Sequence, residues 1–186
     1  MIIFIGVSGA GKGTQSKMLV AEQGYIHLST GEMLRQYATP AQRAGMLEGR
    51  WLDDNEVIAM VEKALEEVPD RNKVILDGFP RTLVQARWVL RQIDCGKLNI
   101  NAVINLDASL DILKMRLLAR GRMDDTEHAI ALRFKEYGKM TRPIIKLFRD
   151  HGIHVSRVDA GQSPEGVHRA VLVCLANGAM LSEPPA

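Results

Sequence analysis

Nine residues near the start of the chain constrain its fold more than any others. The stretch Gly6-Val7-Ser8-Gly9-Ala10-Gly11-Lys12-Gly13-Thr14 follows directly on the apolar run Met1-Ile2-Ile3-Phe4-Ile5. Four residues separate Gly6 from the Gly11-Lys12 pair, which is the spacing of a phosphate-binding loop between a buried strand and a helix. The first N–H groups of such a helix have no intrahelical partner and can bind polyphosphate oxygens. The predicted phosphate ligands are Gly9, Ala10, Gly11, Lys12, Gly13 and Thr14.

The loop departs from the usual pattern at one position. Gly13 stands where a Ser or Thr hydroxyl normally contacts the metal, and Thr14 follows one place later. A hydroxyl is therefore near but displaced. We expect a Mg²⁺ ion to be held mainly through water and the nucleotide.

Length and composition indicate one ordinary globular domain. The chain has 186 residues, of which 46% are hydrophobic and 25% charged, so we expect a single domain over 1–186 with a full core. The net charge of +2 is too small to indicate a nucleic-acid or membrane partner. Aromatic residues make up only 5% of the chain, which argues against a nucleic-acid-remodelling ATPase with a basic, aromatic stripe.

Cysteine usage and targeting patterns favour a reduced, cytoplasmic protein. Cys95 and Cys174 have neither the number nor the spacing of a zinc site, so we expect no structural zinc and expect each to pack as a small apolar residue. No apolar run reaches the ~18 residues of a membrane span, and no cleavable leader pattern is present. Residues 182–186 are expected to be a disordered tail.

The order of apolar segments predicts a doubly wound α/β fold. Short strands are expected at 1–5, 25–28, 73–76, 102–106 and 153–158, and helices at 12–23, 55–68, 83–93, 110–120, 127–151 and 164–175. Five strands that alternate with helices favour a parallel sheet with helices on both faces. Ligands bind at the carboxyl ends of the strands in such sheets. The first three strands end in polar segments, at 6–14, 29–35 and 77–82, so we expect these to form one site.

Four motifs, taken in order, resemble the adenylate kinase family of nucleoside monophosphate kinases over nearly the whole chain. The family loop G-x-P-G-x-G-K-G-T matches 6–14 with Ser8 in place of proline, and S-T-G-D-x-L-R matches 29–35 with Glu32 in place of aspartate. The run D-G-F-P-R-T-x-x-Q is unbroken from Asp77 to Gln85, and R-x-D-D is found at 122–125. The resemblance implies a P-loop NTPase fold of the short-lid type.

The resemblance implies a monophosphate-binding insert at 29–58. Within it Thr30 would contact the adenine of AMP and Arg35 the AMP phosphate, while Arg81 would bind that phosphate and Gln85 the adenine edge. Asp77 would hold Mg²⁺ through water. The full set implied for AMP is Thr30, Arg35, Arg50, Trp51, Leu52, Gly78, Phe79, Arg81, Gln85, Arg122 and Arg133.

The resemblance also implies a lid at about 120–127. The catalytic residues that it implies are Lys12, Arg81, Arg116, Arg122, Arg133, Asp124 and Asp125, and ATP would further contact Arg120 and Gln162. A solvated basic face is the alternative for these arginines. Gly121 alone separates Arg120 from Arg122, so the lid must be minimal and its closure over the nucleotide less complete.

The implied reaction is ATP + AMP = 2 ADP by direct in-line transfer with Mg²⁺, in a protein expected to be a monomer. UMP or CMP kinase activity is an alternative within the same class, against which Thr30 and Gln85 argue. A nucleotide-binding regulator without catalysis is a further alternative. It would be expected to lack Lys12, Arg81 or the lid arginines, and all are present.

Overall fold

A computed structural model describes residues 1–37, 39, 52–122 and 125–181. Its strands are β1 (Ile2–Ile5), β2 (Ile26–Ser29), β3 (Val74–Asp77), β4 (Ala102–Asp107) and β5 (Val155–Asp159). They form one parallel sheet in the order β2-β3-β1-β4-β5. The predicted α/β class, with its five-stranded parallel sheet, is confirmed, and each strand lies within two residues of its expected position.

Strand β1 is the centre of the sheet because all its side chains are apolar and can be buried on both faces. Its four residues are at most 2% exposed, and it pairs with β3 on one side and β4 on the other. Ile2 is in register with both Ile75 and Ala102. The phosphate-binding loop therefore leaves the sheet from its central, fully buried strand.

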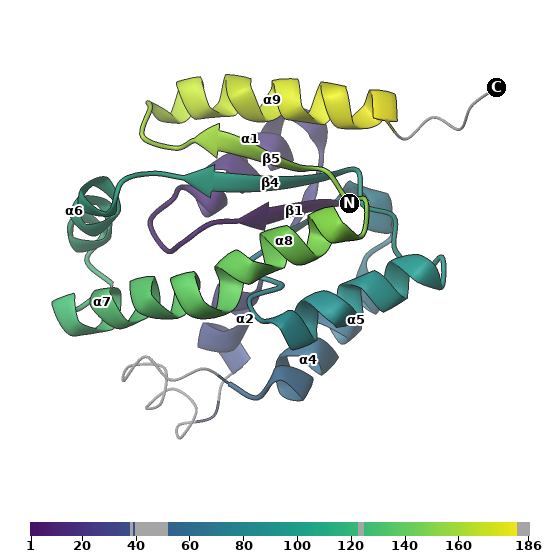
Figure 1. Cartoon of the computed structure of the whole chain (residues 1–186), viewed down its shortest axis with the longest axis horizontal. Coiled ribbons are helices and arrows are strands. Elements are labelled where there is room, and N and C mark those ends of the chain that lie inside the picture. Colours follow the sequence, from purple (N-terminus) through teal and green to yellow (C-terminus); the bar gives the residue numbers. More distant parts are fainter. Residues whose placement is uncertain (38, 40–51, 123–124, 182–186) are drawn as a thin grey trace.

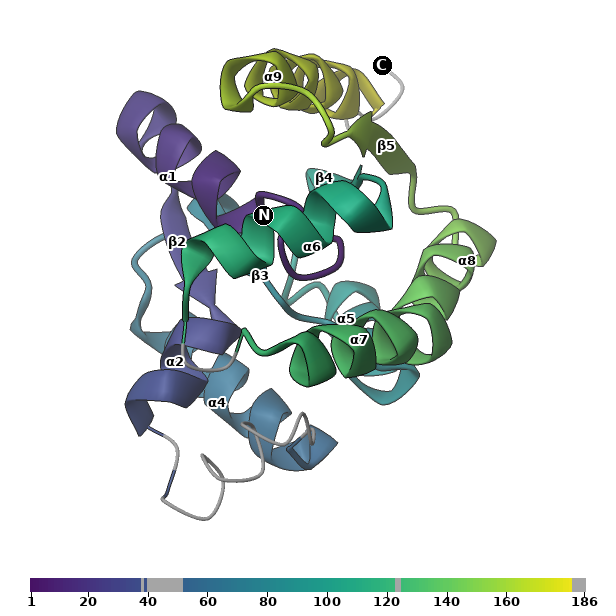
Figure 2. The same ribbon diagram turned by 90° about the vertical axis from the view of Figure 1, so that its left-hand side faces the viewer.

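Helices cover both faces of the sheet (Figures 1 and 2). Helices α1 (Lys12–Gln23), α6 (Leu110–Arg120) and α9 (Pro164–Leu181) supply one core with Ile2, Phe4 and Ile104. Helices α4 (Asp54–Glu67), α5 (Leu83–Asp94) and α8 (Arg142–Asp150) supply the other with Ile3 and Ile5. This split follows from the strand period of two, which points successive side chains to opposite faces.

The expected helix at 127–151 is divided into three parts. Helix α7 (Glu127–Glu136) passes into a π-helical turn, η2 (Tyr137–Thr141), and then into α8. Propensity alone does not separate a π turn from an α-helix, because both use the same backbone region and the turn adds only one residue. Helix α9 extends to Leu181, six residues beyond the end expected from its apolar pattern.

Helix α2 (Thr30–Tyr37) and the short 3-10 turn η1 (Arg71–Lys73) complete the described elements. The expectation for Cys95 is wrong, because its side chain is exposed, whereas Cys174 is half-buried. Cys95 is the C-cap of α5, one position beyond the last turn that packs on the sheet. The tail at 182–186, most of the insert and part of the lid lie outside the described residues. No described helix combines the length and apolarity needed to cross a membrane.

The carboxyl ends of the strands lie at one edge of the sheet. In Figure 1 the arrowheads of β1, β4 and β5 point to the left, toward α6 and the start of α7. Parallel pairing forces this arrangement, because every strand then runs in the same direction. The polar segments after β1, β2 and β3 are therefore brought together.

Two valines in α9 test the assignment of the core. Val171 is fully buried against the sheet, whereas Val173 in the same helix is 59% exposed. We expect Val171→Ala to lower the free energy of unfolding by roughly 1–3 kcal/mol, through lost burial and the cavity left behind. The matched control Val173→Ala should change it by less than about 0.5 kcal/mol. Urea denaturation measures both, and equal effects would contradict the packing of α9.

Candidate active site

The loop after β1 approaches the end of β4 so closely that only glycine fits at its first position. A Cβ on Gly6 would lie 2.6 Å from the carbonyl oxygen of Leu106, and the φ of Gly6 is +151°. The loop then turns into α1, whose N-cap Gly11 has no capping side chain. The first N–H groups of α1 are thereby left for an anion to bind.

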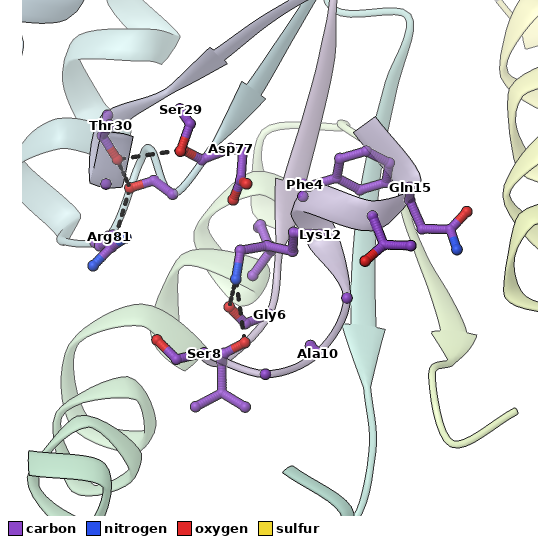
Figure 3. Close-up of a pocket in the computed structure, with 18 of the residues that line it drawn as sticks. Phe4, Gly6, Ser8, Ala10, Lys12, Gln15, Ser29, Thr30, Asp77 and Arg81 are labelled. Carbon is purple, nitrogen blue, oxygen red and sulfur yellow. Dashed lines mark hydrogen bonds between the residues drawn. The ribbon is translucent and has the colours of Figure 1, made fainter. Parts of the chain in front are cut away.

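Lys12 lies at the centre of the candidate site (Figure 3). Its Nζ donates to the carbonyl oxygens of Gly6 at 2.7 Å and Val7 at 3.2 Å, so the ammonium group folds back onto its own loop. Burial is the main cause that lowers its pKa to about 8; Asp77 opposes this shift, and the charges of Arg81 and Arg120 add to it. A bound anion would offset this penalty.

Asp77 ends β3 beside Lys12 and is paired with His27 of β2. The distance from His27 Nε2 to Asp77 Oδ2 is 3.3 Å, and both side chains are largely buried. Burial alone would raise the pKa of Asp77. The hydrogen bond from His27 and the charges of Lys12 and Arg81 outweigh it, so the pKa lies below its usual value and the carboxylate is ionised.

One carboxylate of the site could hold a metal ion through water. Among the described residues, no group of three or more His, Cys, Asp or Glu side chains gathers as a ligand set. A Cβ on Gly13 would lie 3.7 Å from Asp77 Oδ2, so one ionised carboxylate borders the position where other phosphate-binding loops carry their metal-contacting hydroxyl. Mg²⁺ commonly binds through one carboxylate, water and substrate phosphates.

The turn after β3 holds Arg81 against the backbone. The carbonyl oxygen of Gly78 accepts from Arg81 Nε at 2.7 Å and from Thr30 Oγ1 at 2.8 Å. Thr141 of η2 donates in turn to the carbonyl oxygen of Arg81 at 2.9 Å. Burial lowers the pKa of Arg81, Asp77 raises it, and the charges of Arg133 and Arg35 lower it again. Arg81 is thus a buried cation set among other cations.

Gln85 belongs to a second network at the start of α5. Its Oε1 accepts from the backbone N–H of Arg81 at 2.7 Å, and its Nε2 donates to Asp54 Oδ1 at 2.8 Å. The hydroxyl of Thr82 also donates to Asp54 Oδ1 at 2.8 Å and accepts from the backbone N–H of Gln85. Gln85 is only 2% exposed, yet it reaches the wall of the cleft.

A buried carboxylate joins two of the lid arginines. Asp125 accepts from Arg120 Nε at 2.8 Å and Nη2 at 2.7 Å, and from Arg133 Nη1 at 3.1 Å. Burial would raise the pKa of Asp125, but the hydrogen bonds and charge of Arg120 lower it. Because both arginines share one carboxylate, it links the end of α6 to α7.

Carbonyl oxygens hold the loop after β5 in place. Arg116 of α6 donates to the carbonyls of Ala160 at 2.7 Å and Gln162 at 3.2 Å. Gln15 of α1 donates to the carbonyl of Pro164 at 2.9 Å, and its Oε1 lies 2.9 Å from His168 Nδ1. This loop is therefore fixed from both α6 and the phosphate-binding helix.

Many of these groups line one cleft of about 600 Å³, which is open to solvent. Its cationic lining comprises six arginines and two lysines, against the carboxylates of Glu32 and Asp77: Lys12, Lys17, Arg35, Arg81, Arg116, Arg120, Arg122 and Arg133. Such an excess of positive charge, facing unpaired N–H groups, suits a polyphosphate ligand.

Most of the residues expected in the site line this cleft. They are Gly9, Ala10, Gly11, Lys12, Gly13, Thr14, Thr30, Arg35, Leu52, Asp77, Gly78, Arg81, Gln85, Arg116, Arg120, Arg122, Arg133 and Gln162. Asp125 is not part of the lining but accepts hydrogen bonds from Arg120 and Arg133, which are. The side chain of Phe79 lies instead in the core, edge-on to Trp88. Arg50, Trp51 and Asp124 lie outside the described residues.

Sequence reasoning missed several residues that support the site. His27, Asp54, Tyr137 and Thr141 each contact a predicted site residue or line the cleft, and His168 contacts Gln15, which lines the cleft but was not predicted. A lone His or Asp in a helix or strand gives no signal on its own. His27 had a weak signal. It lies two residues before Ser29 in β2, so the two side chains share a face of the strand, and Ser29 is in register with Asp77 of β3.

Comparisons with known proteins place the chain among close relatives. The family model described as adenylate kinase matches residues 4–153. An adenylate kinase of Rhodopirellula baltica is 37% identical over 181 residues, covering 94% of each chain. One from Parasynechococcus marenigrum is 39% identical over 176 residues, covering 91% of this chain and 95% of its own. One from a Mycobacterium species is 35% identical over 180 residues, covering 94% and 98%.

The pKa of Lys12 implies that an anionic ligand takes up a proton on binding. With a pKa lowered to about 8, part of the Lys12 population is neutral in mildly alkaline solution, and neighbouring phosphates would restore its charge. We expect ATP binding to take up more protons at pH 8 than at pH 7. Calorimetry in buffers of different ionisation enthalpy measures this uptake. Lys12→Met should abolish it, and equal uptake at both pH values would contradict the assignment.

Proposed function

The chain belongs to the adenylate kinase family, and on that premise we propose that it catalyses ATP + AMP = 2 ADP. The enzyme class, a nucleoside monophosphate kinase, follows from the family. The observation that supports this reaction is that the Lys12 loop, Arg81 and the lid arginines all line the same cleft. Such a cleft has room for a phosphate donor at the loop and a phosphate acceptor beside Arg81.

The protein's part in this reaction is positioning and charge neutralisation. The attacking AMP phosphate oxygen is already ionised, so no general base is required. Lys12 and the N–H groups of α1 would bind the β- and γ-phosphates of ATP. Arg81, Arg122 and Arg133 would bind the AMP phosphate and the group in transfer, where charge-assisted hydrogen bonds are strongest.

Magnesium, when bound, supplies further positive charge to the phosphates. We propose that Asp77 holds it through water, beside Gly13 and Thr14. The ionised state of Asp77, maintained by His27 and Lys12, supports this assignment. The chain would need no structural zinc.

The remaining roles divide between the two nucleotides. For ATP, Arg116 and Gln162 would border the adenine through the loop after β5, which Arg116 holds by two carbonyls. For AMP, Thr30, Gln85 and Leu52 would surround the base and Arg35 would reach the phosphate. Arg50, Trp51, Phe79 and Asp124 stay predictions from the family resemblance.

Exclusion of water would depend on the minimal lid. Asp125 holds Arg120 and Arg133 together with three hydrogen bonds, so the ends of α6 and α7 would close as one unit. We propose that this carboxylate replaces the longer connection that larger lids provide. A monomeric, cytoplasmic enzyme that acts without nucleic acid or membrane is the corresponding proposal for its setting.

A coupled assay of ADP formation tests the proposal directly. ADP should form rapidly from ATP with AMP, and much more slowly from ATP alone. Measurement of AMP, CMP and UMP side by side tests the acceptor, and a preference for CMP or UMP would overturn it. Tight binding of ATP and AMP without ADP formation would instead make the protein a regulator.

Arg122 tests the role of the lid. It lines the cleft directly after the C-cap of α6. We expect Arg122→Ala to lower kcat about a hundredfold, because a cation that stabilises the transferred group is lost. The control Arg91→Ala changes an exposed arginine of α5 that does not line the cleft, and it should leave kcat unchanged. A kcat for Arg122→Ala within a few-fold of the parent enzyme refutes the assignment.

A further inference from the structure

The amide of Gln85 is fixed in one orientation by its partners. Its Oε1 accepts from the backbone N–H of Arg81, which can only donate. Its Nε2 donates to the carboxylate of Asp54, which accepts. Turning the amide over would place donor against donor and acceptor against acceptor. The oxygen and nitrogen of Gln85 are therefore assigned by chemistry.

Asp54 is the member of this network that also joins two helices. It lies in the first turn of α4, and its Oδ1 accepts from Gln85 and from Thr82, the N-cap of α5, both at 2.8 Å. The hydroxyl of Thr82 meanwhile accepts from the backbone N–H of Gln85 at 3.2 Å. Backbone and side chain of Gln85 are thus both anchored through Asp54 and Thr82.

The fixed amide presents a defined pattern to the cleft. One N–H of Nε2 and one lone pair of Oε1 are not used by Asp54 or Arg81. They match a 6-aminopurine, which offers an amino donor next to a ring-nitrogen acceptor. A 6-oxopurine offers the reverse pattern, a carbonyl acceptor next to a ring N–H. A site whose polar groups cannot rotate rejects the reversed pattern.

We propose that Asp54 is a positioning residue that determines specificity: by fixing the amide of Gln85, it makes the monophosphate site select AMP over IMP. This inference rests on the proposed function, in which Gln85 faces the base of the acceptor nucleotide. The network separates 6-amino from 6-oxo bases. It does not separate adenine from cytosine, which carries the same adjacent donor and acceptor.

The test compares AMP with IMP as acceptors in the parent enzyme and in variants. In Asp54→Ala the amide loses its acceptor and can turn, so we expect the ratio of kcat/KM for AMP over IMP to fall about tenfold. The KM for ATP should stay within about twofold, because the ATP side does not contact Asp54. In Asp54→Asn an amide oxygen still accepts from Gln85, and the ratio should be nearly restored.

Two further variants separate positioning from simple loss of structure. Asp53→Ala removes the neighbouring carboxylate, the N-cap of α4, and should lower thermal stability without changing the AMP-to-IMP ratio. In a Gln85→Leu background, Asp54→Ala should no longer change the ratio, since the group that it positions is absent. If Asp54→Ala does not fold, Asp54→Ser provides the same comparison with a side chain too short to reach the amide.

The outcomes separate this inference from the proposed function. If Asp54→Ala leaves the AMP-to-IMP ratio of kcat/KM unchanged, the inference is overturned. Equal losses with both acceptors would then show a merely structural role for Asp54. If the parent enzyme forms no ADP from ATP and AMP, the proposed function fails. Calorimetric binding of AMP and IMP to the parent enzyme and to Asp54→Ala then decides the inference by the same ratio.

Discussion

The cleft gathers far more positive charge than its own carboxylates can balance, and much of the surrounding structure compensates for this excess. Backbone carbonyl oxygens accept hydrogen bonds from several of these cations: Lys12 donates to two of them, Arg116 to two and Arg81 to one. Among the described site residues, Asp77 and Asp125 are the carboxylates whose pKa is lowered by hydrogen bonds and charges of neighbouring cationic side chains. In the free protein the positive charge of the cleft is therefore only partly compensated, and a bound anion would lower the electrostatic cost of burying it.

The sheet could be predicted from the sequence because its signals are local and redundant. The run from Ile2 to Ile5 is apolar on both faces, and the spacing from Gly6 to Lys12 allows few alternatives. Parallel pairing then fixes where the strand ends lie, which is why Thr30, Asp77 and Arg81 were expected near Lys12. Periodicity and glycine spacing place the segments 29–35 and 77–82 beside the loop, and the resemblance to the adenylate kinase family singles out Thr30, Asp77 and Arg81 within them.

The supporting residues could not be predicted, because their partners are distant in the chain. Asp54 meets Gln85 across 31 positions, and Gln15 meets His168 across 153. A sequence shows only that such polar residues occur in amphipathic helices, where a solvated position is the ordinary outcome. Only the packing of α4 on α5 and of α1 on α9 reveals that they are paired, and that Gln15, Gln85 and His168 are buried.

The π-helical turn η2 changes which face of α8 points to the core, relative to α7. One extra residue in a turn rotates the next helix by roughly 100° about its axis relative to an unbroken α-helix. Arg133 of α7 can therefore line the cleft while Ile144 and Phe148 of α8 face the core. Without that phase shift, Arg133 and Ile144 would lie on nearly the same face of one continuous helix, because their spacing is close to a whole number of α-helical turns. The turn therefore lets α7 present Arg133 to the cleft while α8 presents apolar side chains to the core.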